Sequence, residues 1–264
     1  MSSIFNVVFL SLLISTDLSI EDEKRIYGGR YANPGEFPWM VFIKVTDELN
    51  CSGYLISSSY ILTAAHCMIS PLQDMIARIG NIDSDSGQVY TFRSFSKHPD
   101  YDNNTLYGDI ALLKLSNPVT FTPDVNRICL PSNNAFYNHE TPVLQMGWGR
   151  FSNTSKEVTK ILKVTDIGKV YGHNECQQLF DSLNITLPNG HVCVKNSGID
   201  GVCEGDTGGP LVVKRGTEYT AIRSDSVGFY ANCSIDNNFV EIFNDIFYHR
   251  QWIIDQMDET ICEN

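Results

Sequence analysis

The apolar residues of this chain come in short runs that Gly, Pro, Asn and Ser interrupt, and this rhythm limits the folds open to it. The runs occupy residues 40–45, 54–56, 60–63, 110–115, 143–146 and 210–213. Runs of this length suit β-strands and are too short for most helices, which need roughly 10 residues or more. The sequence therefore predicts an all-β protein of the barrel kind.

Helical periodicity is confined to two segments. Residues 174–183 have the pattern of a short amphipathic helix. Near the C-terminus, Asn244 or Asp245 can cap a second helix. Its expected apolar face consists of Ile246, Phe247, Ile253, Ile254 and Met257. We therefore expect one short internal helix and one helix close to the end of the chain.

The composition is that of an ordinary globular protein. The 264 residues are 42% hydrophobic and 19% charged, which is enough for one or two packed cores. The formal net charge is −12. Nucleic acids and anionic membranes are bound through clusters of Lys and Arg, so we expect neither as a partner.

The N-terminus has the pattern of a secretory signal peptide. Residues 4–14 form an apolar run, and residues 15–19 are mostly small and polar. The run is too short to cross a bilayer, and the alternative is an apolar N-terminal strand. We expect residues 1–19 to be a signal peptide, with a charged stub at 20–25, and the protein to be secreted and extracellular.

Eight cysteines also favour an oxidising compartment. They are spread along the chain without a Cys-x-x-Cys pair, so metal binding is the less favoured interpretation and every disulfide pairing stays open at this point. Five Asn-x-Ser/Thr sequons fit a secreted glycoprotein. They begin at Asn50, Asn103, Asn153, Asn184 and Asn232.

Residues 201–211 (GVCEGDTGGPL) are too irregular for a helix or a strand. Glycines allow backbone angles that other residues avoid, and they let neighbouring N–H groups converge on one anion. An oxyanion hole is built in this way. The alternative is an ordinary surface turn, because Gly-Gly-Pro is common in turns.

Two upstream motifs favour the functional interpretation. They are TAAHC at 63–67, with His66, and GDIALLKL at 108–115, with Asp109. Together the three motifs resemble the chymotrypsin-like (trypsin family, S1) serine proteases, and the resemblance runs from Ile26 to the C-terminal helix. It implies two six-stranded antiparallel β-barrels with a C-terminal helix, at about 26–130 and 131–264, and catalytic residues in the cleft between them.

The resemblance also implies the role of each catalytic residue. His66 is the expected general base and Asp109 the group that orients it. The family's nucleophile is the serine of Gly-Asp-Ser-Gly-Gly-Pro, and this chain has Thr207 there. The backbone amides of Gly205 and Thr207 are the expected oxyanion hole. The other histidines, His98, His139, His173, His191 and His249, have no such context and are expected at the surface.

The same resemblance predicts a zymogen with residues 20–25 as the activation propeptide. Cleavage after Arg25 frees the amino group of Ile26, which is expected to pair with the buried carboxylate of Asp206. This pairing assembles the oxyanion hole in the family. An unprocessed charged linker is the alternative.

The expected substrate pocket departs from the trypsin pattern. Gly201 stands where trypsins have an aspartate, and Glu241 stands where the family usually has a pocket-wall glycine. Glu241 either plugs the pocket, which is the preferred interpretation, or presents a carboxylate to Lys or Arg. Ser226, Val227 and Gly228 resemble the strand that lies beside bound substrate.

Four disulfides follow from the resemblance and from the two cysteines left over. They are Cys51–Cys67, Cys176–Cys193, Cys203–Cys233 and Cys129–Cys262. No cofactor or metal is expected. The loop with Asp83 and Asp85 has Asn81 where calcium-binding members have their first glutamate, so a solvated turn is expected there.

Thr207 decides the functional prediction. Its extra methyl restricts χ1 and sits where the substrate or the imidazole must approach, and misplacing an attacking atom by about 1 Å costs on the order of a hundredfold in rate. We therefore expect a catalytically impaired homologue, a pseudoenzyme that binds proteins or peptides in the interbarrel cleft or modulates proteases and inhibitors of a proteolytic cascade. The alternative is an active secreted endopeptidase, a hydrolase that uses Thr207 with His66 and Asp109.

Overall fold

The computed structural model describes residues 29–105, 107–134, 143–149, 159–167, 169–181, 186–195, 206–228 and 240–264. One antiparallel sheet is built from the first half of the chain. Its strands are β2 (Met40–Lys44), β3 (Asn50–Leu55), β4 (Tyr60–Thr63), β5 (Ile76–Ile79), β6 (Gln88–Tyr90), β7 (Phe92–Lys97) and β8 (Ala111–Leu115). They lie in the order β6-β5-β2-β3-β4-β8-β7. Each of the three apolar runs expected here before residue 100 overlaps a strand of this sheet.

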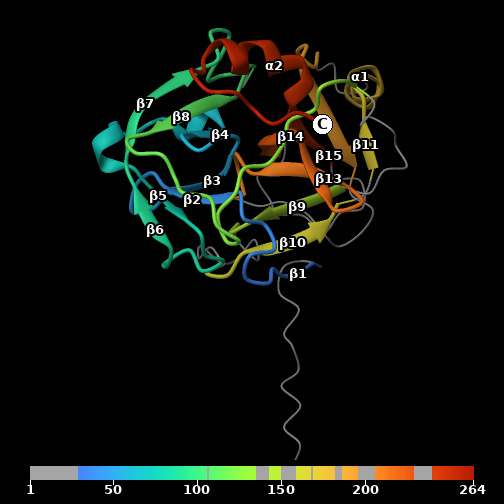
Figure 1. Cartoon of the computed structure of the whole chain (residues 1–264). Helices are drawn as coiled ribbons and strands as arrows, with labels where there is room; N and C mark the ends of the chain where they lie inside the picture. Colours follow the sequence, from blue (N-terminus) through green and yellow to red (C-terminus); the bar gives the residue numbers. More distant parts are fainter. Residues whose placement is uncertain are drawn as a thin grey trace, which may run out of the picture.

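A second antiparallel sheet takes most of its strands from the second half. These are β9 (Val143–Gly147), β10 (Lys163–Asp166), β11 (Lys169–Tyr171), β12 (His191–Lys195), β13 (Pro210–Arg215), β14 (Glu218–Gly228) and β15 (Val240–Asp245). A short N-terminal strand, β1 (Arg30–Tyr31), joins it by pairing with β10. The order is β1-β10-β9-β13-β14-β15-β12-β11. The two sheets curl side by side in Figure 1, which confirms the all-β prediction and the chymotrypsin-type architecture.

The strand counts differ from the expected six and six. The described part of the chain gives seven strands in the first sheet and eight in the second. The extra members are short strands at sheet edges, such as β1 and β11. β1 also crosses the expected division between the halves, because residues close to Gly29 pair with Lys163 and Val164 and not with their own half of the chain.

The hydrophobic core joins the two halves. Trp148 and Met146 of the second half pack in one cluster with β2, β3, β4 and β8 of the first. Helix α2 (Ile246–Asp255) adds Ile246 and Ile253 to the same cluster, both with no exposed surface. A separate cluster, with Phe180 and Phe243, lies within the second half. Because the two sheets share one core, their positions relative to each other are fixed.

The two helices lie close to their predicted positions. Helix α1 spans His173–Asp181, and α2 follows β15 directly and crosses the top of the molecule in Figure 1. Asp245 caps α2 by accepting a hydrogen bond from the Tyr248 amide at 3.2 Å. The predicted apolar face is wrong at Phe247, which is 36% exposed, whereas Ile246 and Ile253 are fully buried in the core.

Three of the four expected disulfides are formed. They are Cys51–Cys67, Cys129–Cys262 and Cys176–Cys193. Cys203 and Cys233 lie outside the described residues. The Cys129–Cys262 bridge ties the segment between the two sheets to the chain end, and the Leu130 amide donates to the Cys262 carbonyl beside it.

The expectation of surface histidines is wrong at His191 and His249. Both are buried, at 3% and 1% exposed. The His249 ring packs edge-on against His98, with 4.8 Å between centroids, and His98 also contacts Trp252. An imidazole without its proton is largely apolar, so an aromatic cluster buries it, and no local sequence pattern marks this. His139 lies outside the described residues.

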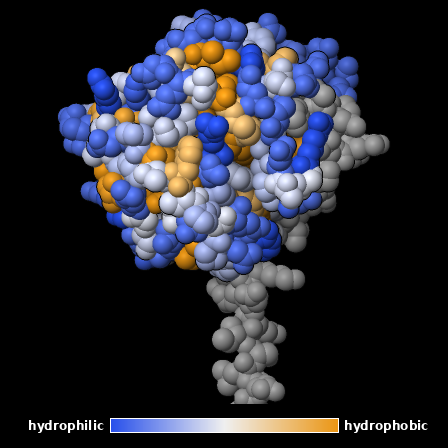
Figure 2. Space-filling model, viewed as in Figure 1, coloured by the Kyte–Doolittle hydropathy of each residue, from blue (hydrophilic) through white to orange (hydrophobic). Residues whose placement is uncertain are grey.

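The face shown in Figure 2 is predominantly hydrophilic, with hydrophobic residues in small groups between polar ones. Within the described parts of the chain, no helix is both long and apolar enough to cross a membrane.

Candidate functional site

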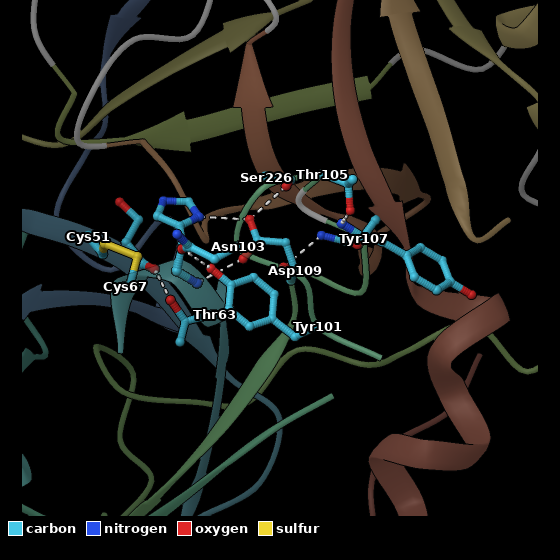
Figure 3. Close-up of polar contacts among 12 residues, drawn as sticks. Cys51, Thr63, Cys67, Tyr101, Asn103, Thr105, Tyr107, Asp109 and Ser226 are labelled. Carbon is cyan, nitrogen blue, oxygen red and sulfur yellow. Dashed lines mark hydrogen bonds and ion pairs between the residues drawn. A yellow bond between two sulfur atoms is a disulfide. The ribbon is translucent and has the colours of Figure 1, made fainter. Parts of the chain in front are cut away.

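His66 and Asp109 come together at the edge of the first sheet that faces the second. His66 lies in a short 3-10 helix (Ala65–Cys67) after β4, and Asp109 precedes β8, which pairs with β4. The His66 Nδ1 atom lies 2.7 Å from Asp109 Oδ2, and the His66 amide donates to Asp109 Oδ1 at 2.8 Å (Figure 3). Two contacts to one carboxylate fix both the position and the orientation of the imidazole.

The second sheet completes the surroundings of Asp109. The Ser226 hydroxyl of β14 donates to Asp109 Oδ2 at 2.7 Å, and the Asn244 side chain of β15 donates to the Asp109 carbonyl at 2.8 Å. Asp109 has no exposed surface. Burial by itself raises the pKa of this carboxyl, but the hydrogen bonds from His66 and Ser226 outweigh it and hold the pKa below its ordinary value. Asp109 is therefore an ionised acceptor at neutral pH.

The loop with Thr207 is held against the first sheet. The Ser52 amide donates to the Thr207 carbonyl at 2.8 Å, and the Thr63 hydroxyl donates to the Ser52 carbonyl at 2.8 Å. Gly208 has φ of +83°, and a Cβ there would lie 2.3 Å from the Thr63 hydroxyl. Only glycine fits this close approach. The Cys51–Cys67 disulfide braces the same region, since Cys51 precedes Ser52 and Cys67 follows His66.

Thr207 itself is partly buried. Among the residues that the structure describes, none is hydrogen-bonded to its hydroxyl, His66 included. Its backbone amide likewise has no acceptor within the described ranges, whereas the amides of Gly208 and Gly209 donate to the Asp225 and Asp206 carbonyls. The Thr207 amide is thus available to a ligand. Gly205, the other expected oxyanion donor, lies outside the described residues.

The carboxylate of Asp206 points into the protein beside two glycines. Its Oδ1 atom accepts a hydrogen bond from the Gly149 amide at 2.7 Å. A Cβ on Gly149 would lie 2.2 Å from Asp206 Oδ2, and one on Gly147 would lie 2.1 Å from Oδ1. The lack of side chains at these positions creates the space for the carboxylate. Ile26, its expected partner after cleavage, lies outside the described residues.

This packing predicts that Gly149→Ala destabilises the chain by about 1–3 kcal/mol, because the new methyl must displace a buried carboxylate. The matched control is Gly172→Ala, where the nearest atom to an added Cβ is a Glu175 carboxylate oxygen at 3.6 Å. Urea unfolding of the two variants and the wild type measures the difference. Equal unfolding midpoints for both variants would show that the Asp206 carboxylate does not occupy this space.

The structure describes part of the expected substrate pocket. β14 and β15 pair Val227 with Ile242 and Gly228 with Glu241, and the Glu241 side chain has no exposed surface. Ser226 has a further role that sequence reasoning missed, since its hydroxyl binds Asp109. Gly201 lies outside the described residues.

Asn244 and Asp225 were also missed as site residues. Asn244 is a plausible helix cap by sequence, yet its side chain binds the Asp109 carbonyl. Asp225 lies between two serines of β14 and is 3% exposed. No local pattern in this polar stretch of the sequence marks Asp225 as buried.

No group of three or more His, Cys, Asp or Glu residues suited to a metal ion occurs in the described part of the chain. In the loop with Asp83 and Asp85, the Asp83 amide donates to the Asn81 side chain and the Asp85 amide donates to the Asp83 side chain, both at 2.9 Å. These contacts are those of a polar turn that satisfies its own backbone.

Comparison with known proteins gives one consistent result. The family model described as Trypsin matches residues 26–253. Brachyurin of Leptuca pugilator is 29% identical over 89% of this chain and all of its own length. Trypsin delta of Drosophila melanogaster is 29% identical over 87% of each chain. Phenoloxidase-activating factor 3 of Holotrichia diomphalia is 28% identical over 90% of this chain and 74% of its own length.

The family match covers the segments that carry His66, Asp109 and Thr207. The two curled antiparallel sheets and the terminal helix agree with it. This chain therefore belongs to the trypsin family of chymotrypsin-like (S1) proteases and their homologues.

Proposed function

We propose that this chain is a secreted S1 protease homologue with impaired catalysis, which acts by binding protein or peptide substrates in the cleft between the sheets. The observation that carries the proposal is Thr207 at the position of the nucleophile, in a site whose His66–Asp109 pair is fully assembled. The base and its orienting acid are retained, while the attacking group carries a methyl that the site has to accommodate. Among His66, Asp109 and Thr207, the proposed defect thus lies in the side chain of Thr207.

The same hydroxyl makes no hydrogen bond to His66 in the described structure, which supports this proposal. A nucleophile is activated when its proton can pass directly to a neighbouring base. Catalytic hydrogen bonds often lengthen without substrate, so the main obstacle to catalysis is the methyl group of Thr207. Binding of a peptide in the cleft does not require a hydrogen bond between Thr207 and His66.

Three relatives suggest where such a protein acts. One is named as a phenoloxidase-activating factor, and others are named as trypsins or serine proteases. A homologue that binds without cleaving competes for the substrates or inhibitors of such proteases. We therefore place this chain in an extracellular proteolytic cascade as a modulator.

Peptide hydrolysis by protein cleaved after Arg25 tests the proposal. The expected result is hydrolysis of a mixed fluorogenic peptide library at the rate of the His66→Ala variant, which lacks the base and reports contaminating protease. The second candidate function, an endopeptidase that uses Thr207, is favoured by the intact His66–Asp109 pair. Hydrolysis that exceeds the His66→Ala rate by a hundredfold would establish this second function instead.

Cleavage after Arg25 is also expected to order the loop around Thr207 even without catalysis. The freed ammonium of Ile26 is the proposed partner of the Asp206 carboxylate. Pairing with such a partner offsets the free-energy cost of burying the carboxylate, which is about several kcal/mol. Hydrogen exchange before and after cleavage should show rising protection at residues 202–208, with the amides of β2 unchanged as the control. Unchanged protection in the loop would mean that the switch has been lost.

A further inference from the structure

A buried lysine lies on the same face of the second sheet as the Asp206 carboxylate. Lys163 of β10 stands opposite Gly147 of β9, and directly opposed residues of an antiparallel pair share a face. An added Cβ on Gly147 would lie 2.1 Å from Asp206 Oδ1, so the carboxylate occupies this face. Opposed Cβ atoms lie about 5 Å apart and a lysine stem has four carbons, so the Lys163 ammonium can reach Asp206.

The Lys163 ammonium is buried without a hydrogen bond. Lys163 is 2% exposed, and its Nζ atom donates to no residue that the structure describes. Nζ instead lies 4.9 Å from the centre of the Tyr31 ring on β1. The face of an aromatic ring attracts an ammonium more weakly than a buried carboxylate does. Lys163 is thus a buried cation that lies within reach of a stronger partner.

The charge of Asp206 already acts on Lys163 at this distance. Burial lowers the pKa of Lys163 from 10.5 to about 8, and the negative charge of Asp206 opposes this shift. Such coupling is mutual, so a charged Lys163 favours the ionised, inward-pointing carboxylate by the same amount of free energy. The two groups are therefore coupled although no hydrogen bond joins them.

A second unsatisfied polar group lies on the same face. Gln145 is two residues before Gly147 on β9, so the two positions share a face. Gln145 is 3% exposed, and within the described ranges neither its amide nitrogen nor its amide oxygen has a hydrogen-bond partner. Buried polar groups are normally paired. Because Lys163 and Gln145 have no hydrogen bonds to lose, the side chains beside Asp206 can rearrange at little cost.

We propose that Lys163 is a positioning residue, whose ammonium pairs with Asp206 in the uncleaved chain and holds the Thr207 loop in shape until Ile26 takes its place. The inference rests on the proposed function, in which the Ile26 ammonium is the partner of Asp206 after cleavage. A rotation of the Lys163 stem from the Tyr31 ring to the carboxylate is sufficient. The long stem loses rotamer freedom on pairing, so Lys163 is the weaker partner and cleavage still adds order.

Asp206 passes this effect to the loop through the backbone. The Gly209 amide donates to the Asp206 carbonyl at 2.9 Å, and the Gly208 amide donates to the Asp225 carbonyl at 3.0 Å. We call these two the reporter amides. Their hydrogen bonds depend on the position of Asp206, so we expect them to open more often when its carboxylate has no cation beside it. Their exchange with solvent therefore measures the order of the Thr207 loop.

Hydrogen exchange of the uncleaved chain tests the role of Lys163. Lys163→Met should lower the protection factors of the reporter amides by about tenfold or more, because the cation beside Asp206 is lost. Lys163→Gln is the second variant if Lys163→Met does not fold. In an Asp206→Asn background, the same change should alter protection by less than about twofold. The matched control is Lys214→Met, which removes a lysine 5.1 Å from the centre of the Tyr219 ring and should leave the reporter amides unchanged.

A pH series and cleavage separate the charge of Lys163 from its packing. In the uncleaved wild type, protection of the reporter amides should fall as the pH rises above about 8, because Lys163 then loses its proton. Lys163→Met should show no such fall. In the described structure, the other titratable groups that face Lys163 are Asp206 and Tyr31. After cleavage at Arg25, the loss in Lys163→Met should shrink to less than about twofold, because Ile26 then supplies the cation.

Two results would overturn the inference. If the reporter amides of uncleaved Lys163→Met keep wild-type protection, Asp206 does not depend on Lys163. If Lys163→Met lowers protection equally in the Asp206→Asn background, Lys163 supports the fold through packing alone. A loss that requires Asp206 but persists after cleavage would contradict only the pairing of Ile26. Hydrogen exchange reads loop order without turnover, so rapid peptide hydrolysis by wild type would contradict the proposed function and leave the role of Lys163 standing.

Discussion

Thr207→Ser in the cleaved protein is expected to restore stoichiometric labelling by a fluorophosphonate, at a rate at least about a hundredfold above that of wild type. The reason is geometric, because His66 is already held at 2.7 Å from Asp109 and the Thr207 amide is available to donate a hydrogen bond to an oxyanion. Removing one methyl lets the hydroxyl reach the imidazole in a rotamer that threonine disfavours. Labelling rates followed by intact mass measure the change.

The matched control is the double variant with His66→Ala, which should stay unlabelled because the base is gone. We expect peptide hydrolysis to return less fully than labelling, since hydrolysis also requires a side chain that the cleft accepts. If Thr207→Ser stays unlabelled, the defect extends beyond this side chain, and the residues outside the described ranges around Gly205 become the place to search.

His249 is expected to contribute a large loss of stability on acidification between pH 6.5 and about 3. Burial, assisted by the nearby His98 and His191, lowers the pKa of His249 from 6.5 to about 3. Between pH 6.5 and about 3, His249 is protonated in the unfolded chain and unprotonated in the folded chain. Folding therefore becomes less favourable as the pH falls through this range. A shift of this size corresponds to about 3–5 kcal/mol.

Urea unfolding of wild type and His249→Phe at several pH values measures this effect. The variant should keep most of the stability that wild type loses between pH 6.5 and 4. Two neighbouring groups bear on the comparison, since Asp100 lies 4.0 Å from His98 and Tyr248 packs against the His249 ring. Asp109 acts in a different window, because its lowered pKa adds stability that is lost only below about pH 3.8. Equal acid losses in both proteins would contradict the assignment to His249.

The strands and the His66–Asp109 pair could be predicted because their signals are local. The runs at 40–45, 60–63 and 143–146 become β2, β4 and β9 with shifts of one residue at most. His66 follows β4 and Asp109 precedes β8, and these two strands pair, so the two motifs bring the two side chains together. Three disulfides also formed as the resemblance implied.

The contacts between the two sheets could not be predicted in this way. Ser226 and Asn244 reach Asp109 from positions more than a hundred residues away, and only the packing of one sheet on the other brings them there. β1 pairs with β10 for the same reason. His98 and His191, which lie near the buried His249, come from two distant segments, and no periodicity in the sequence records this.

The covalent state of Thr207 in the wild type tests the central claim most directly. Protein cleaved after Arg25 is incubated with excess fluorophosphonate, and its intact mass and peptide map are compared with those of the His66→Ala variant. We predict that both proteins keep their unmodified mass, because the threonine hydroxyl does not attack even with the His66–Asp109 pair in place. A stoichiometric adduct on Thr207 in the wild type, absent from His66→Ala, would show that this chain is an active enzyme.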